Sequence, residues 1–293
     1  MPTDARRLWQ EVVSSWVGLI AVFGLLPFLL ISTWRLVRRL SGMTPGHPGF
    51  GVVWLLILSV LATALTLVVV VWAIWSTTRI PTRPVQSLCV AAIAATVWAA
   101  TTLVWSPPRS RVVMVGAAVV SYLALAIGAS FLGKLIAAGF KDQNLVLPAA
   151  VAAALVDYWG VYFGTTRQIV TQHHNLVHKV SVHIPSLAPG LGLDIGPGDF
   201  VFLGIIFALL HRFDLKPART AMVMACLLAI AAVIPMVSPL SVPGVVPMGL
   251  AVLIVNGRSF KYERSELFAL LYAAVMLGVG AAAWWLFHRG HAH

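Results

Sequence analysis

The stretch GPGDFVFLGIIFALLH, residues 196–211, carries a single acidic side chain, Asp199, at the start of an otherwise apolar segment. The preceding apolar segment, NLVLPAAVAAALVDYWGVYFG at residues 144–164, also carries a single acidic side chain, Asp157. A charged carboxylate in hydrocarbon costs about 3 kcal/mol or more and is tolerated mainly where it lines a wet cavity or has a partner. Asp157 and Asp199 are therefore candidates for a functional pair on two neighbouring helices.

The composition excludes most classes of soluble protein. Hydrophobic residues make up 60% of the chain and charged residues 10%, and the mean hydropathy is +0.92. So few polar residues could not cover the surface of a soluble protein. The net charge of +11 is scattered over short connections between apolar runs, as membrane topology rules require, and forms no nucleic-acid-binding stripe. We expect an integral, multi-pass protein that contacts the lipid bilayer and binds no nucleic acid.

Segments of about 20 apolar residues predict membrane-spanning helices. Nine candidate spans follow along the chain, at residues 12–34, 50–75, 87–105, 112–132, 144–164, 196–211, 220–237, 242–256 and 266–287. The expected fold class is thus an all-α polytopic membrane protein with about nine transmembrane helices. Two spans, 196–211 and 242–256, are short and rich in Gly or Pro. This indicates unwound ends that line a protein cavity, because lipid cannot bond to freed backbone groups.

These spans suggest three regions. Residues 1–143 form an amino-terminal region of four transmembrane helices, residues 144–257 form a core with the two Asp-bearing helices, and residues 258–293 add a carboxyl-terminal helix and a tail that contains His. Alternate connections hold twelve Lys and Arg on one side and eight on the other. The positive-inside rule then places the amino terminus in the cytoplasm and the loop between Asp157 and Asp199 outside.

The positions of Asp157 and Asp199 bring both carboxylates toward one leaflet. Asp157 lies about two turns before its helix leaves the membrane, and Asp199 lies within about one turn of the next entry. Two carboxylates held close together cannot both ionise comfortably, so the pair shares a proton near neutral pH. One Asp can then act as a base on water while the other donates to a carbonyl, which is aspartic protease chemistry. Gly196 and Gly198 are expected to allow close helix approach, and Pro197 suits a helix start.

Two motifs surround these aspartates. The first is LVDYWGVYFGT at residues 155–165, and the second is GPGDF at 196–200 followed by ALLHRFD at 208–214. They resemble the two catalytic segments of the presenilin and signal peptide peptidase family of intramembrane aspartyl proteases. In that family a Tyr-Asp or similar pair is followed by aromatics and, in the signal peptide peptidases, by Phe-Gly-Thr. A Gly-x-Gly-Asp motif opens the second helix, which in the signal peptide peptidases ends with Leu-Leu-Arg-Phe-Asp. The resemblance implies an aspartic endopeptidase with Asp157 and Asp199 as catalytic residues. It also implies an active-site motif made of Tyr158, Gly196, Pro197 and Gly198.

The third element of that family is a Pro-Ala-Leu tripeptide, for which PGV at residues 243–245 is the best candidate, although only the proline is shared. The resemblance implies that Pro243, Gly244 and Val245 hold an unwound substrate through backbone groups. It covers residues 144–257. The chain departs from the family in having Pro197 at the x position, four spans before Asp157 where the family has five, and an extra span at 266–287.

The resemblance also implies a class of substrate and a location in the cell. Substrates would be transmembrane helical peptides or proteins that unwind locally, including remnants of signal peptides, and neither a metal nor an organic cofactor is implied. The predicted orientation of the Asp157–Asp199 hairpin is that of signal peptide peptidases. We expect a prokaryotic-type homologue in a cytoplasmic membrane.

Two other functions stay open. A catalytically inactive family member could bind or escort membrane proteins, since the tripeptide is degenerate. A small-solute transporter could use intramembrane aspartates, but it would usually contain related halves, and no internal repeat is visible. The His-Glu-x-x-His of zinc proteases and the Gly-x-Ser with a distant His of serine proteases are not present as credible motifs.

The remaining ionisable residues are interpreted as structural. Asp194 precedes the glycines and is expected in a solvated loop, and Asp214 is expected to be an interfacial charge beside Arg212 and Lys216. Several histidines have no obvious ligand set with a carboxylate or Cys, so a solvated loop and a tail are expected in place of a metal site. They are His173, His174, His178 and His183 in the loop and His288, His291 and His293 at the end.

Overall fold

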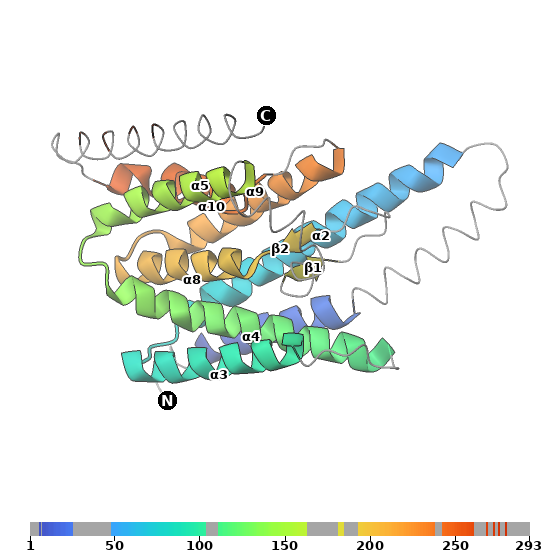
Figure 1. The fold of residues 1–293 in the computed structure, drawn as a ribbon, viewed down its shortest axis with the longest axis horizontal. Helices are drawn as coiled ribbons and strands as arrows, with labels where there is room; N and C mark the ends of the chain where they lie inside the picture. Colours follow the sequence, from blue (N-terminus) through green and yellow to red (C-terminus); the bar gives the residue numbers. More distant parts are fainter. Residues whose placement is uncertain are drawn as a thin grey trace, which may run out of the picture.

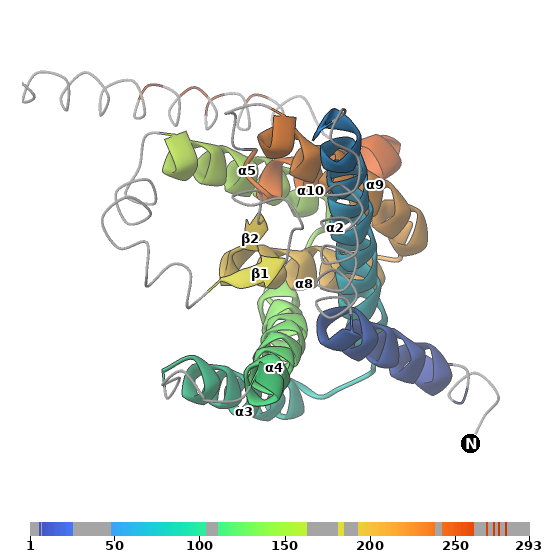
Figure 2. The same ribbon diagram turned by 90° about the vertical axis from the view of Figure 1, so that its right-hand side faces the viewer.

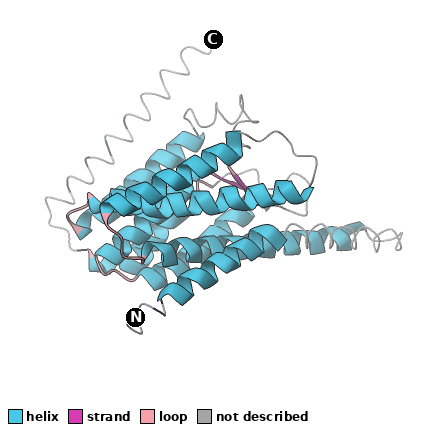
Figure 3. Ribbon diagram, turned by 90° about the horizontal axis from the view of Figure 1, so that it is seen from below, coloured by secondary structure: helices cyan, strands magenta, loops and turns pink. Residues whose placement is uncertain are grey.

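The computed structural model describes residues 6, 8–25, 48–103, 111–162, 181–184, 193–237, 242–260, 268, 272, 275 and 279. Within these ranges the chain is almost entirely helical, with one two-stranded antiparallel ribbon (Figure 3). An amino-terminal helix at Leu8–Leu25 precedes the labelled elements. These are α2 (Pro48–Thr78), α3 (Pro84–Leu103), α4 (Arg111–Ala138), η1 (Gln143–Leu145), α5 (Val146–Tyr162), β1 (Val182–Ile184), β2 (Leu193–Ile195), α8 (Pro197–Arg212), α9 (Pro217–Val237), α10 (Val245–Asn256) and η2 (Gly257–Ser259).

Five of the described helices are long and apolar enough to cross a membrane, at Leu8–Leu25, Ile57–Thr78, Pro84–Thr102, Val115–Ala138 and Pro217–Pro235. A bilayer core about 30 Å thick requires about 20 helical residues. The chain is therefore a helical membrane protein, as its composition predicts. Helices α5, α8 and α10 are shorter and lie in three further predicted segments. The predicted segment at 266–287 lies outside the described residues, apart from isolated positions.

Helix α8 occupies the centre of the helical bundle, with α4 on one side and α5 and α10 on the other (Figures 1 and 2). Helix α2 also packs against α8. Eight of the sixteen residues of α8 are buried, and Phe200, Phe207 and Leu210 are almost completely covered. In lipid this burial acts through close van der Waals packing between helices, since leaving lipid for protein itself gains an apolar side chain little. This central helix, which begins two residues before Asp199, is therefore the best-anchored element of the fold.

Helices α4 and α8 approach until their backbones touch at Gly133 and Gly204. A Cβ atom at Gly133 would lie 2.3 Å from the carbonyl carbon of Gly204, and one at Gly204 would lie 2.3 Å from the carbonyl oxygen of Ala129. Helices in lipid associate through such small residues, since apolar side chains gain little by leaving lipid for protein. The two glycines thus set the separation of α8 from α4.

Polar side chains tie down the carboxyl-terminal ends of α8 and α10. The Arg212 guanidinium donates to the carbonyl oxygen of Ala137 at 3.0 Å, which joins α8 to α4. The fully buried Asn256 donates to the hydroxyl of Thr220 at 2.8 Å and accepts from the backbone N–H of Lys216 at 3.1 Å. Because buried polar groups need partners, these bonds hold the end of α10 beside the start of α9.

The predicted regions 1–143 and 144–257 share one bundle, since α2 packs against α9 and α4 packs against α8. The ribbon pairs Val182 with Ile195 and ends one residue before Gly196. Its second strand contains Asp194, so the expectation that this residue lies in a loop is wrong. The reason is the alternation of apolar Leu193 and Ile195 around Asp194, which is the pattern of a short strand.

Replacing Gly133 with Ala should destabilise the bundle, because the new methyl group would overlap the backbone of α8. Overpacking of this kind costs about 1–3 kcal/mol. Thermal unfolding of the purified protein in detergent measures the loss, with Gly116→Ala as the control. Gly116 lies on the same helix and a Cβ there meets no described atom within 4 Å. An equal unfolding temperature for the two variants would contradict the α4–α8 contact.

Candidate functional site

Asp157 lies near the carboxyl-terminal end of α5 and its carboxylate reaches the start of α10. Asp157 is half-buried, and its Oδ2 accepts a hydrogen bond of 3.1 Å from the backbone N–H of Val245. Val245 is the first residue of α10. Its N–H is one of the four amide groups at a helix start that have no partner within the helix. Asp157 therefore sits at the positive end of the α10 dipole, where a negative charge is stabilised.

The first turn of α8 orients the second carboxylate. Gly196 is extended at the helix cap, with φ −68° and ψ 151°, and Pro197 occupies the first helical position, where no N–H is needed. The Oδ2 of Asp199 accepts from the N–H of Gly196 at 3.2 Å, and the N–H of Asp199 donates to the Gly196 carbonyl at 3.1 Å. This reciprocal pair resembles a capping box and holds the Asp199 side chain against its own helix start.

The two carboxylates contact adjacent residues, Gly244 and Val245. A Cβ atom on Gly244 would lie 2.8 Å from Oδ1 of Asp199 and 3.1 Å from its Cγ, so the carboxylate rests directly against this glycine. Asp157 bonds to the next residue, Val245. The two carboxylates thus meet consecutive residues at the start of α10, close enough for their charges to interact. Three separate helices, α5, α8 and α10, converge at this point.

A cavity of about 130 Å³ lies beside Asp199. Apart from this carboxylate and Gly244, its described lining is apolar and comes from α2, β2, α8, α9 and α10. The apolar lining residues are Leu67, Val70, Val71, Ile195, Leu203, Leu228, Ala231, Ala232, Pro235, Val242 and Met248. Since a water molecule takes up about 30 Å³ in the liquid, the cavity has room for water next to the carboxylate. It can alternatively accept an apolar side chain.

The glycines of the GPGDF motif lie at the start of α8. A Cβ on Gly198 would meet no described atom within 4 Å, and one on Gly196 would lie 3.6 Å from Oδ2 of Asp199, an ordinary contact. Among the described residues neither glycine makes a close contact with another helix, and their predicted role in helix approach stays a prediction. Gly196 caps α8, and Gly198 is exposed on its first turn. The residue that must lack a side chain is Gly244.

Two other predicted site residues are neighbours of the site in sequence, and Asp214 is distant from it. Tyr158 follows Asp157 on α5 and is 46% exposed. Pro243 precedes α10, and its carbonyl accepts from the N–H of Val246 at 3.3 Å. Asp214 lies just beyond the opposite end of α8 with a φ of 49°, exposed and away from Asp199.

Among the histidines of the predicted loop, His183 belongs to the described residues. His173, His174 and His178, like the terminal histidines, lie outside the described residues, and His183 pairs through its backbone with Asp194. Within the described ranges no group of three His, Cys, Asp or Glu side chains is placed to hold a metal ion.

Sequence reasoning missed two contacts of the site. It assigned Gly244 and Val245 to substrate, whereas Gly244 packs against Asp199 and the N–H of Val245 bonds to Asp157. The Pro-Gly pair at 243–244 does indicate a helix start, which always offers unpaired N–H groups. No pattern in the chain reveals that both carboxylates converge there, since the contacts span 88 and 45 residues of sequence, the differences 245 − 157 and 244 − 199.

Comparisons of the chain with protein-family models, curated proteins and solved structures find no match.

The capping role of Asp199 can be separated from its charge. Asn at position 199 keeps an oxygen that can accept from the N–H of Gly196, whereas Ala does not. We expect Asp199→Ala to lower the free energy of unfolding by about 1 kcal/mol, as for loss of a helix cap, and Asp199→Asn to lower it less. Thermal unfolding in detergent compares the two. A smaller loss for Ala than for Asn would contradict the capping contact.

Proposed function

We propose that this protein is an intramembrane aspartyl protease that hydrolyses peptide bonds within transmembrane segments. The observation that carries the proposal is the convergence of Asp157 and Asp199 on the first turn of α10. Intramembrane carboxylates are costly and mark functional sites by default. The motifs at 155–165 and 196–214, which resemble those of the presenilin and signal peptide peptidase family, lend independent support from the sequence.

The hydrogen bonds of the two carboxylates suit this chemistry. In each carboxylate the described backbone hydrogen bond engages Oδ2, from Val245 to Asp157 and from Gly196 to Asp199. The Oδ1 atoms of the pair are thereby available to a water and a substrate. The bonds also orient the carboxylates, and a positioned acid or base contributes about 10²–10⁴-fold to the rate.

The mechanism requires one protonated and one ionised Asp. The ionised carboxylate takes a proton from water, the water oxygen bonds to the peptide carbonyl carbon, and the protonated carboxylic acid donates its proton to the carbonyl oxygen. When the resulting diol collapses, the C–N bond breaks and the departing nitrogen receives a proton from the pair. Burial of the pair and the repulsion between two close carboxylates both favour the state in which one of them is protonated, which fills both roles.

Substrate binding is assigned to the segment before α10 and to the adjoining cavity. Pro243 lies outside α10, so the non-helical backbone before this helix can face an extended strand. The apolar cavity beside Asp199 suits the side chains of transmembrane segments. Substrates would be single transmembrane helices that unwind locally, among them remnants of signal peptides.

The proposal includes a finer architecture. It comprises nine transmembrane helices with a presenilin-like core at 144–257, an amino terminus in the cytoplasm and the Asp157–Asp199 loop outside, in the cytoplasmic membrane of a prokaryote. The five long helices and the three shorter ones in predicted spans support this arrangement.

A second function, an inactive member that binds membrane proteins, is favoured by one specific observation. Both carboxylates accept hydrogen bonds from backbone N–H groups and so would have a structural use without catalysis. Asn preserves those hydrogen bonds but cannot act as a proton donor or base, so Asp→Asn variants discriminate between the two functions.

Cleavage of a panel of transmembrane peptides in liposomes tests the protease. We expect Asp157→Asn and Asp199→Asn each to lower the cleavage rate at least about a hundredfold, because each removes an acid or base. A transition-state-mimicking aspartyl protease inhibitor should block the wild type. The control is Asp214→Asn, which removes an exposed carboxylate at the other end of α8 and keeps a residue that tolerates positive φ. Cleavage at the wild-type rate by both site variants would refute the proposal.

Gly244→Ala tests the geometry of the pair. The new Cβ would displace the Asp199 carboxylate, and a shift of about 1 Å in a catalytic group can cost about a hundredfold in rate. The matched control is Gly249→Ala on the same helix, where a Cβ would lie 3.5 Å from the carbonyl oxygen of Ala150, an ordinary contact. Initial cleavage rates of the two variants, normalised to folded protein, give the comparison. Equal rates would show that Asp199 need not rest against Gly244.

A further inference from the structure

A second cavity, of about 350 Å³, lies at the end of the bundle opposite the aspartates. It opens between the end of α2, the start of α3 and the carboxyl-terminal ends of α4 and α8. Arg212, which lines it, is 13 residues from Asp199 along α8, the difference 212 − 199, or about 20 Å at the rise of an α-helix. The cavity is therefore separate from the candidate protease site.

Lys134 and Arg212 give this cavity a positive charge. The Lys134 ammonium donates to the carbonyl oxygen of Ile80, and the Arg212 guanidinium donates to that of Ala137 at 3.0 Å. An ammonium has three donors and a guanidinium five, so one carbonyl oxygen satisfies neither group. No Asp or Glu occurs among the described residues that line the cavity.

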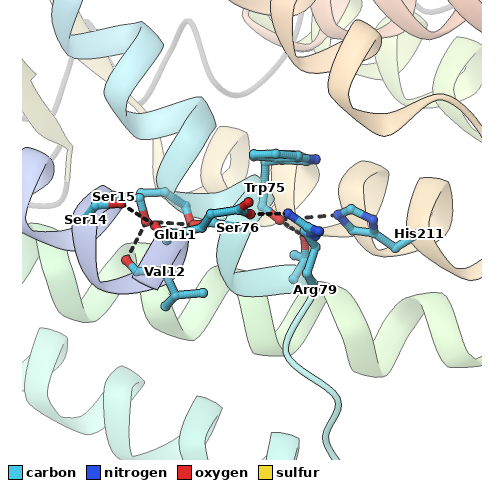
Figure 4. A network of polar contacts seen from close by, with 10 residues as sticks. Glu11, Val12, Ser14, Ser15, Trp75, Ser76, Arg79 and His211 are labelled. Carbon is cyan, nitrogen blue, oxygen red and sulfur yellow. Dashed lines mark hydrogen bonds and ion pairs between the residues drawn. The ribbon is translucent and has the colours of Figure 1, made fainter. Parts of the chain in front are cut away.

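Arg79 also lines the cavity, but its charge is balanced. Its guanidinium forms an ion pair with Glu11 of the amino-terminal helix and lies 5.1 Å from the centre of the Trp75 ring (Figure 4). The carbonyl of Trp75 lies 3.3 Å from Nε2 of His211 in the same network. This network closes one wall of the cavity and leaves Lys134 and Arg212 as the cations without a described acidic partner.

The start of α3 adds to the positive potential. Pro84 and Ser87 from its first turn line the cavity, and the hydroxyl of Ser87 lies 2.8 Å from that of Thr82. Pro84 has no N–H, and that of Ser87 donates to the carbonyl of Arg83 at 3.0 Å, so this turn offers the cavity the dipole of α3 and the Ser87 hydroxyl. Two cations and two hydroxyls thus face one space.

The depth of the cavity points to a ligand from the membrane. Lys134 belongs to the apolar span Val115–Ala138, where a cation without a counter-anion is costly. The same cavity is lined by apolar Leu135 and Ala138 and opens at the ends of two membrane-spanning helices, α2 and α4. Under the predicted orientation it faces the cytoplasmic leaflet, and basic pockets between helices on that side bind anionic head groups.

We propose that this cavity binds the phosphate group of an anionic phospholipid, held by Lys134, Arg212 and the first turn of α3. The lipid supplies the counter-anion that the described residues lack, and its acyl chains lie along the apolar ends of α2 and α4. A bound lipid would link the amino-terminal helices to α8 from the side opposite Asp199.

Native mass spectrometry of the purified full-length chain tests this proposal by titration with phosphatidylglycerol or with phosphatidylcholine of the same acyl chains. We expect the wild type to prefer phosphatidylglycerol. Since each basic residue contributes about 1 kcal/mol to binding, the double variant Lys134→Gln, Arg212→Gln should bind it about 25-fold more weakly. The matched control is Lys216→Gln, Arg258→Gln, which removes one Lys and one Arg that are exposed near the same end and line no part of the cavity.

A single variant and a competition with inorganic phosphate complete the experiment. Arg212→Gln alone changes an exposed side chain and should weaken binding about fivefold, which covers the case in which the double variant fails to fold. Inorganic phosphate should displace the lipid only weakly. Equal binding of the two lipids by the wild type, or equal losses in the cavity and control variants, would overturn the proposal. Tight binding of inorganic phosphate with full displacement of lipid would assign the cavity to a soluble phosphate compound and would also overturn it.

Discussion

The positions of the two carboxylates are fixed by their contact with the first turn of α10. The N–H of Val245 and the bare Cα of Gly244 receive Asp157 and Asp199 from two different helices. Helix starts always present unpaired N–H groups, and in lipid these groups have no water to bond. A carboxylate at the start of α10 gives an unpaired N–H group an acceptor. The N–H group and the helix dipole in turn stabilise the half-buried carboxylate.

Helix α8 connects this contact to the rest of the bundle. Its first turn orients Asp199, its middle touches α4 at Gly204, and its last turn holds Arg212 against α4. Helix α8 is one continuous helix from Pro197 to Arg212, so both ends belong to the same hydrogen-bonded backbone. The proposed lipid site and the proposed catalytic pair therefore share one structural element, although they lie about 20 Å apart along it.

The same hydrogen bonds serve both a structural and a catalytic interpretation of the aspartates. A capping carboxylate at a helix start is common and needs no further function. What distinguishes this site is the presence of two carboxylates, close enough for their charges to interact, beside a cavity that can hold water. Electrostatic repulsion raises the free energy of such a pair, a cost that helix capping alone does not require. This cost favours the proposed catalytic role over capping alone.

The helical membrane architecture and the two aspartates follow from the amino-acid sequence alone, because hydrophobic length and isolated charges are local properties of the chain. The extended Gly196 and the helix start at Pro197 are local in the same sense, since each depends on its immediate neighbours. The contact of Asp199 with Gly244 and the basic cavity at Lys134 and Arg212 depend on tertiary structure. They join residues separated by tens of positions, and only the packing of whole helices determines which backbone groups those side chains reach.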